Sequence, residues 1–397
     1  MITFNHTFGG NKAKNIISVF AGVLLLFVVI TVYGDEPDTI PAGEMEARYL
    51  IHMYVQKRTN IEIDDSLDRI PGKFRFSEMY QIQRKKVEQQ QLTYKQQLRR
   101  YHAELDSLAD KYRKTAARTP SGIWKLTEFY NGFDVKIPVD YKKYWDLYIE
   151  NIEDWANEYP DSPTPRIALA SILINRAWAY RTGLPAKEVD AKAWKTFNYY
   201  ISQAKLILEG NKPVASKDPH WYALMTTVAT AESWDLAKFL RLIDEGTSKY
   251  PYYYQIYFRG INYLLPRWHG GFDQMEAFAN AAVKKTKSKE KMAMYARIYW
   301  AASGVYGKRL FLESKVNWNN MRQGMIDVLN QYPDSWNINN FAYFSCFAKD
   351  KETAKKLTGM IKQPLMGVWE AQEVFDACKN WTNGKDAGLL EMIMPGK

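Results

Sequence analysis

The dipeptide Tyr-Pro ends three helix-forming stretches of this chain, with its tyrosine at Tyr159, Tyr250 and Tyr332. Proline cannot continue a helix, so each stretch must stop there and a new one must begin. Two of the three junctions continue as Asp-Ser, and such side chains can cap the N-terminus of the next helix. Successive junctions lie 91 and 82 residues apart, which leaves room for about two helical hairpins in each interval. This repetition predicts an α-solenoid, in which similar hairpins stack on one another.

Between these junctions, apolar stretches of helical length alternate with short turns, and no run of alternating β-branched residues interrupts them. We therefore predict an all-α fold, in which residues 119–397 form a right-handed α-solenoid of antiparallel helix pairs. The predicted helices are Tyr141–Glu158, Pro165–Arg181, Val189–Leu208, Pro219–Ser233, Trp234–Lys249, Tyr252–Leu265, Phe272–Lys285, Lys289–Val305, Trp318–Gln331, Trp336–Ala348, Lys351–Lys362 and Val368–Trp381.

The turn Leu264–Gly270 has the sequence Leu-Leu-Pro-Arg-Trp-His-Gly. Together with the Tyr-Pro-Asp-Ser junctions and the blocks Gly122–Tyr130, Pro163–Trp178 and Asn340–Cys346, it resembles a bacterial family of tetratricopeptide-repeat-like proteins that carry a domain of unknown function. The resemblance covers roughly residues 75–382. It implies a tetratricopeptide-like helical fold, and it implies no particular reaction because the family has no assigned activity.

Residues 73–118 contain no glycine or proline and are predicted to form one long, basic amphipathic helix. Apolar residues recur there every seven positions, at Tyr80, Val87, Tyr94, Tyr101 and Leu108. The complementary heptad position is supplied by Leu98, Leu105 and Tyr112. Three uses of this seam are open: packing on the following helices, a coiled-coil contact in a homodimer, or contact with acidic lipid or the acidic segment that precedes it.

Residues 16–33 form an apolar stretch of 18 residues without a charge. A helix of that length spans about 27 Å, close to the hydrocarbon thickness of a bilayer. Lys12 and Lys14 precede the stretch and a cluster of acidic residues follows it, so the positive-inside rule places residues 1–15 in the cytoplasm. We predict a transmembrane signal anchor that crosses a bacterial inner membrane once.

On this topology residues 34–72 form an acidic connector, and residues 35–397 lie in the periplasm. The alternative is a signal peptide cleaved after Gly34, which would give a periplasmic or secreted protein. The formal net charge is +10, with the basic excess concentrated in 73–118. We expect no nucleic-acid partner, because this basic segment lies outside the cytoplasm in either case.

Cys346 and Cys378 are the only two cysteines. In an oxidising compartment we expect them to form a disulfide between two helices, with a pair of free buried thiols as the alternative. The five histidines are too widely spaced for a helical metal-binding motif, and no nucleotide-binding or nucleophile-elbow pattern is present. We therefore expect no metal and no cofactor.

One turn concentrates residues that are suited to chemistry. Arg267, Trp268 and His269 are followed by Asp273 and Glu276. His269 beside either carboxylate would suit proton transfer, and Arg267 would suit binding of a carboxylate. The competing interpretation is structural: the tryptophan fills the groove between helix pairs, and the polar residues fix the turn by hydrogen bonds.

Six tyrosines lie between positions 250 and 263, among them Tyr253 and Tyr257. On the inner surface of a solenoid such rings would anchor a peptide or glycan, whereas the commoner alternative is packing in the core.

We thus expect a membrane-anchored periplasmic scaffold that binds another envelope protein or peptide and performs no catalysis. One alternative is a hydrolase or transferase with its site at residues 264–276. A second is a structural protein that assembles with itself through the heptad seam of residues 73–118.

Overall fold

The computed structural model describes residues 94–134, 139 and 141–385, and every regular element in this part of the chain is a helix. Among these residues the only β-type pairing is an isolated bridge between Arg118 and Trp124. The predicted all-α class is therefore confirmed over the described residues. The helices are α4 (Tyr94–Thr115), α5 (Lys125–Asn131), α6 (Lys142–Glu158), α7 (Thr164–Arg181), η2 (Ala186–Glu188), α8 (Ala191–Gly210), α9 (Lys212–Ala215), α10 (His220–Ala231), α11 (Leu236–Lys249), α12 (Tyr254–Tyr263), α13 (Phe272–Glu290), α14 (Ala293–Tyr306), η3 (Gly307–Arg309), α15 (Leu310–Glu313), α16 (Trp318–Gln331), α17 (Ser335–Phe347), α18 (Lys351–Met360), α19 (Met366–Trp369) and α20 (Gln372–Thr382).

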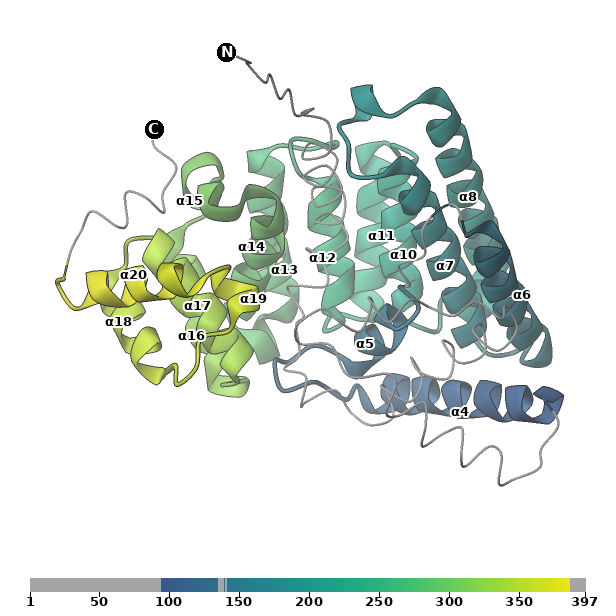
Figure 1. The fold of residues 1–397 in the computed structure, drawn as a ribbon, viewed down its shortest axis with the longest axis horizontal. Coiled ribbons are helices and arrows are strands. Elements are labelled where there is room, and N and C mark those ends of the chain that lie inside the picture. The colour runs from purple at the N-terminus through teal and green to yellow at the C-terminus, as the bar shows by residue number, and fades with distance from the viewer. Residues whose placement is uncertain (1–93, 135–138, 140, 386–397) are drawn as a thin grey trace, which may run out of the picture.

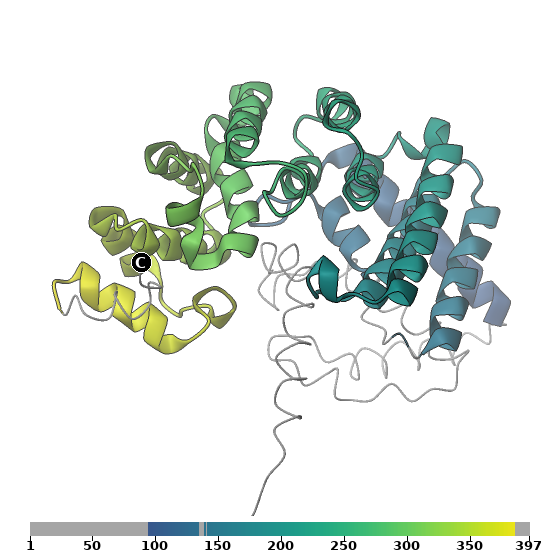
Figure 2. The ribbon, with the colours of Figure 1, turned by 90° about the horizontal axis from the view of Figure 1, so that it is seen from above.

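From α6 onward the helices follow one another across the molecule in chain order (Figure 1). Seen from above, this sequence of helices bends into an arc (Figure 2). Two sets of helices alternate along it. We call α7, α10, α12, α14 and α17 the first row, and α8, α11, α13, α16 and α18 the second row. Contacts run between the two rows and also within the first row, from α7 through α10 and α12 to α14.

The two rows differ in how much of each helix is buried. The first-row helix α14 and the second-row helix α11 both have 14 residues, yet eleven are buried in α14 and five in α11. The buried residues of α11 form a single face, as in an amphipathic surface helix. Those of α14 surround the helix, and such a helix needs cover on every side. The first row therefore contributes most of the core.

The three Tyr-Pro junctions have the same backbone geometry. Tyr159, Tyr250 and Tyr332 end α6, α11 and α16 with φ of −122°, −132° and −136° and ψ of 68°, 65° and 71°. Each tyrosine donates its backbone N–H to the carbonyl four residues earlier. The capping predicted from Asp-Ser is present after the third junction, where the Asp334 side chain accepts from the N–H of Asn337 at 2.9 Å. The three helix ends are thus alike in geometry, whereas the predicted cap is missing after the first junction, where the N-cap residue of α7 is Pro163 and no side chain caps the helix.

Residues 116–134, which include α5, cross the first-row helices and hold them together. Asn175 of α7 donates to a backbone carbonyl of this segment at 3.2 Å. At the other end, the carbonyl oxygen of Ser121 accepts from Arg297 of α14 at 3.0 Å and from Asn337 of α17 at 3.2 Å. One short segment thus contacts the first row from α7 to α17.

The described part of the basic helix, α4, packs one of its faces against the rest of the molecule. Leu105 and Tyr112 of α4 are 3% and 5% exposed, whereas Tyr101 and Leu108 are only partly buried. The buried positions are therefore those of the complementary heptad set, to which Leu105 and Tyr112 belong. The helix α4 contacts α5 and α7. This favours intramolecular packing among the three predicted uses. Residues 73–93 of the helix lie outside the described part of the chain.

Several predicted helix ends need correction. The break predicted between Phe272–Lys285 and Lys289–Val305 falls inside α13, which continues to Glu290. The helix predicted over 73–118 ends at Thr115, because Ala116 has a left-handed φ of 48°, which stops a helix. The helix predicted over Val368–Trp381 is two helices, α19 and α20, since Glu370 between them has a φ of 66°.

The predicted anchor at 16–33 and the connector at 34–72 also lie outside the described residues. Within 94–134 and 141–385, none of the helices is both long enough and apolar enough to cross a bilayer.

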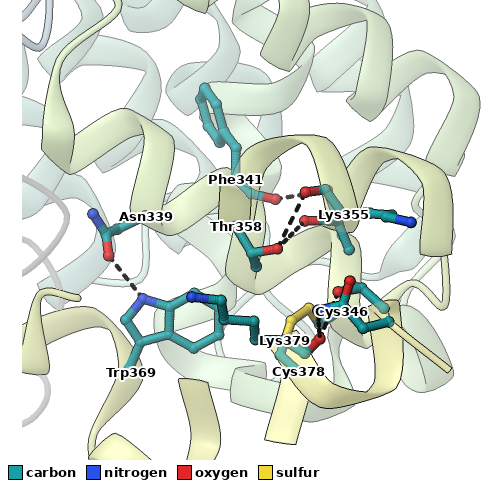
Figure 3. The surroundings of a disulfide bond; sticks show 12 residues. Asn339, Phe341, Cys346, Lys355, Thr358, Trp369, Cys378 and Lys379 are labelled. Carbon is teal, nitrogen blue, oxygen red and sulfur yellow. Dashed lines mark hydrogen bonds between the residues drawn. A yellow bond between two sulfur atoms is a disulfide. The ribbon is translucent and has the colours of Figure 1, made fainter. Parts of the chain in front are cut away.

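Cys346 of α17 and Cys378 of α20 form a disulfide, with their Cα atoms 6.0 Å apart (Figure 3). The predicted pairing is confirmed. Close by, the indole N–H of Trp369 in α19 donates to the side-chain oxygen of Asn339 in α17 at 2.8 Å. The disulfide and this hydrogen bond together fasten the last helices to the first row.

Candidate binding site

A pocket of about 90 Å³ lies between α5, the first-row helices α7, α10 and α12, and the turn that follows α12. Val305 of α14 closes one side of it. About 10–15 Å³ is enough for one water molecule, so the pocket has room for a polar group of several atoms.

The walls are built from helix faces. The helices α7, α10 and α12 each contribute residues spaced three or four positions apart, which therefore point the same way. These residues are Ser171, Ile174, Asn175 and Trp178 on α7, His220, Leu224, Thr227 and Thr230 on α10, and Arg259 and Asn262 on α12. Seven of these ten side chains are polar, in helices that are otherwise largely apolar.

Arg259 lines the pocket without a partner among the described residues. Its Nε–H is buried and has no hydrogen-bond acceptor, and no ion pair joins its guanidinium to a carboxylate in this part of the chain. Asp134 is the one carboxylate among the described lining residues, and its Oδ1 already accepts from Asn175 at 2.8 Å.

Arg267 lies on the turn after α12, where part of its side chain reaches solvent. Burial of the rest lowers the pKa of its guanidinium, and the neighbouring positive charge of Arg181 lowers that pKa further. The group stays protonated at neutral pH because arginine begins far above 7. Among the described lining residues, the cations Arg259 and Arg267 therefore outnumber the single carboxylate of Asp134.

Three tryptophans surround Arg181 beside the pocket. Its guanidinium carbon lies 5.4, 5.2 and 5.9 Å from the rings of Trp178, Trp194 and Trp268. Only 6% of the residue is exposed, and its Nη1 donates to two backbone carbonyls, at 3.1 and 2.9 Å. Because Trp178 and Trp268 also line the pocket, this arrangement fixes two of the pocket walls.

His220 begins α10 at the pocket wall and is 3% exposed. Its ring stacks on Tyr130, with centroids 4.4 Å apart, and its Nδ1 lies 2.7 Å from the hydroxyl of Tyr253. Burial lowers the pKa of His220 well below its ordinary value, and the positive charge of Arg259 adds to the effect. The ring is therefore neutral at pH 7.

No protein-family model matches this chain, and neither does any curated protein or solved structure.

The structure does not join the three residues predicted for proton transfer. His269 is partly buried, and its Nε2 donates to the backbone carbonyl of Thr230 at 3.0 Å. Asp273 is 83% exposed and pairs with Lys315. Glu276 accepts from the hydroxyls of Tyr295 and Tyr299, at 2.8 and 2.5 Å, and from the amide of Asn280 at 2.9 Å. Each group is bound to other partners, so His269 forms no pair with Asp273 or Glu276.

The other predicted residues divide between the pocket and the core. Arg267 and Trp268 line the pocket, as the ligand-binding interpretation of the turn requires. Tyr253 and Tyr257 are 0% and 1% exposed, so both belong to the core and not to an open surface. The hydroxyl of Tyr257 donates to the carbonyl oxygen of Pro251 at 3.1 Å.

Sequence reasoning missed Arg259, Asn262 and Ser171. The available signal was a polar residue in the middle of a helix that is apolar on nearly all sides. Asn175 and Arg259 carry this signal most clearly, because a long polar side chain in such a helix needs a partner or a cavity.

Proposed function

We propose that this protein is a membrane-anchored binding module that holds a segment of another envelope protein or peptide in the pocket between α7, α10 and α12. The observation that carries the proposal is the polar lining of that pocket. Arg259 has no acceptor there, and Arg267 adds a second cation beside a single carboxylate. Polar groups left unpaired inside a protein cost free energy, and a bound ligand recovers it.

Binding accounts for the site better than catalysis does. The histidine that lines the pocket, His220, is neutral, and its Nδ1 already lies within hydrogen-bond distance of Tyr253. His269 is held by a backbone carbonyl and lacks the carboxylate that would orient it for proton transfer. Recognition needs only pre-positioned hydrogen-bond donors and flanking rings, and the pocket supplies both.

The proposed periplasmic location has two supports. The first is the uncharged stretch at 16–33, preceded by Lys12 and Lys14. The second is the pairing of Cys346 with Cys378, since stable disulfides are typical of oxidising compartments.

The proposed architecture is a tetratricopeptide-like α-solenoid, as in the bacterial family that the sequence resembles. Its supports are the matching dihedral angles at Tyr159, Tyr250 and Tyr332 and the two alternating rows of helices. Residues 116–134 lie across the first-row helices, and the binding that we propose is at the pocket between α5 and those helices.

Site-specific photo-crosslinking in living cells tests the proposed function. Benzoylphenylalanine replaces Thr227, a partly exposed residue of the pocket wall. The matched control places it at Tyr199 of α8, which is 56% exposed and does not line the pocket. We expect irradiation to give a discrete product with an envelope protein from position 227 alone.

Equal products from positions 227 and 199, or none from either, would contradict a binding role for the pocket. A product formed only with cytoplasmic proteins would contradict the proposed location.

A further inference from the structure

We propose that the pocket recognises a single carboxylate group on its partner, bound between the guanidinium groups of Arg259 and Arg267. This inference rests on the proposed function and specifies its ligand. It also predicts binding of small carboxylates by the purified protein, which is measurable without knowing the partner.

The charge of the pocket favours a ligand with a single negative charge. Its described lining carries Arg259 and Arg267 against Asp134, whose Oδ1 is occupied by the amide of Asn175. One added monoanion makes the lining neutral. A phosphate dianion would instead leave the lining with a net negative charge, and Asp134 would repel it.

The hydrogen-bond donors of the pocket also favour a carboxylate. A guanidinium offers five N–H donors in a planar fork that matches a carboxylate. Arg259 makes no hydrogen bond within the described part of the chain, and the contact of Arg267 there is a ring, Trp268, with its guanidinium carbon 6.0 Å from the centroid. Other arginines of the first row are bonded: Arg297 to Ser121, for example, at 3.0 Å. Among the described arginines of the first-row helices, Arg259 alone has neither a hydrogen bond nor an ion pair, and it lines the pocket.

A third, independent observation comes from α7. Ser171 lines the same pocket and is 4% exposed, and its hydroxyl has no hydrogen-bond partner in the structure. A serine inside a helix usually donates to the carbonyl four residues earlier, as Ser345 does in α17 at 2.7 Å. A ligand oxygen in the pocket would give Ser171 the acceptor that it lacks.

The size of the pocket fits this ligand. A volume of about 90 Å³ has room for a carboxylate and the few atoms attached to it. Two sources present such a group: the C-terminus of a polypeptide, and the side chain of an aspartate or glutamate. The amide of Asn262 and the hydroxyl of Thr227, which also line the pocket, can bond the peptide group next to either.

The test follows the Arg259 side chain directly by NMR. The full chain, purified in mild detergent with ¹⁵N-labelled arginine, is titrated with acetate, and the Nε–Hε signals are recorded. Arg259→Gln identifies the signal of interest by its disappearance. We expect acetate to shift that signal saturably, and we expect the neutral analogue methyl acetate to leave it in place.

Three further titrations identify the source and the specificity. The probes are trialanine with a free C-terminus, its C-terminal amide, and an amidated tripeptide with glutamate in the middle. If trialanine with a free C-terminus is the only peptide that binds, the ligand is the C-terminus of a chain. If the amidated glutamate peptide binds, the ligand is an acidic side chain. Either outcome supports carboxylate recognition. Equal binding of the trialanine amide, or stronger binding of inorganic phosphate, would overturn it.

Variants separate binding from folding. Acetate binding to Arg259→Gln is followed through the Nε–Hε signal of Arg267. Arg259→Gln and Arg267→Gln should each weaken acetate binding at least about tenfold, because each removes a charged hydrogen-bond donor. Ser171→Ala should weaken it about two- to fivefold. The thermal midpoints of Arg259→Gln and Ser171→Ala should not fall, since neither side chain makes a bond in the free protein. Arg241→Gln, on the exposed face of α11, is the matched control and should bind as the wild type does.

The two proposals fail in different ways. If acetate and the peptides leave the Arg259 signal unmoved while crosslinks from position 227 persist, the carboxylate inference is wrong and the binding role stands. If acetate binds and no crosslink forms, the pocket recognises carboxylates but does not serve the proposed protein partner.

Discussion

The Nδ1 atom of His220 lies 2.7 Å from the hydroxyl oxygen of Tyr253, at the wall of the pocket. Arg259 projects from α12 on the same wall, and its positive charge adds to the effect of burial in lowering the pKa of His220. The backbone N–H of His220 also donates to the carboxylate of Asp218 at 2.8 Å. The imidazole is therefore fixed in a neutral state by its surroundings.

This neutrality predicts a pH dependence of stability. The unfolded chain binds a proton at His220 near pH 6.5, whereas the folded chain does so only at much lower pH. Below pH 6.5 the unfolded state thus holds more protons, and the free energy of unfolding falls as the pH falls, by up to about 1.4 kcal/mol per pH unit.

Urea denaturation between pH 4.5 and 7.5 measures this slope. His220→Gln should remove the part of the pH dependence of the free energy of unfolding that comes from His220. It should also lower stability at pH 7, because the contact with Tyr253 is lost. An identical slope in wild type and variant would show that His220 is not the group responsible.

Arg181 should contribute more to the free energy of unfolding than an ordinary surface charge does, because three tryptophan rings and two carbonyl oxygens surround it. We expect Arg181→Ala to lower the free energy of unfolding by about 2–4 kcal/mol. Arg181→Lys keeps the positive charge but loses the planar guanidinium. It should therefore lower the free energy of unfolding by less than Arg181→Ala does, while staying less stable than the wild type. Guanidinium denaturation gives both values, and a lysine variant as stable as the wild type would contradict the account.

The disulfide should stabilise the C-terminal end of the molecule. Cys346 and Cys378 are 32 residues apart in sequence, and closing a loop of that length contributes about 2–4 kcal/mol. The double variant Cys346→Ala with Cys378→Ala should lose about this much, and a reductant should lower the thermal midpoint of the wild type but not of the variant. If the reductant lowers both midpoints equally, its effect does not come from this bond.

Two glycines should respond in opposite directions to the same substitution. A Cβ on Gly324 of α16 would lie 2.5 Å from the carbonyl oxygen of Met292 and 2.9 Å from the Cβ of Ala296. A Cβ on Gly359 of α18 would meet nothing within 4 Å. We expect Gly324→Ala to lose about 1–3 kcal/mol and Gly359→Ala to gain about 0.5–1 kcal/mol. Thermal unfolding of both variants checks the contrast, and two shifts of the same sign would contradict the packing of α16 on α14.

Local signals made much of the fold predictable. Proline after Tyr159, Tyr250 and Tyr332 forbids a helix whatever the rest of the chain does, and all three helices end there. The left-handed residues Ala116 and Glu370 carried no such signal, because neither is glycine or asparagine. The helix ends at those two positions were therefore placed wrongly.

Contacts between distant residues could not be predicted in the same way. Ser121 and Asn337 are 216 positions apart, and nothing near either residue in the sequence indicates that they are bonded. The same holds for the pocket, which brings Ser171 and Arg259 together through the packing of three helices. Of the residues in the predicted turn, Arg267 and Trp268 line the pocket, whereas His269 bonds a backbone carbonyl, as the structural interpretation of the turn expects.

The most direct test of the account is the crosslink yield from position 227 in three backgrounds: wild type, Arg259→Gln and Arg241→Gln. The account predicts a yield at least about tenfold lower with Arg259→Gln, and an unchanged yield with Arg241→Gln, at equal protein levels. Equal yields in all three backgrounds would contradict the claim that the pocket binds the partner.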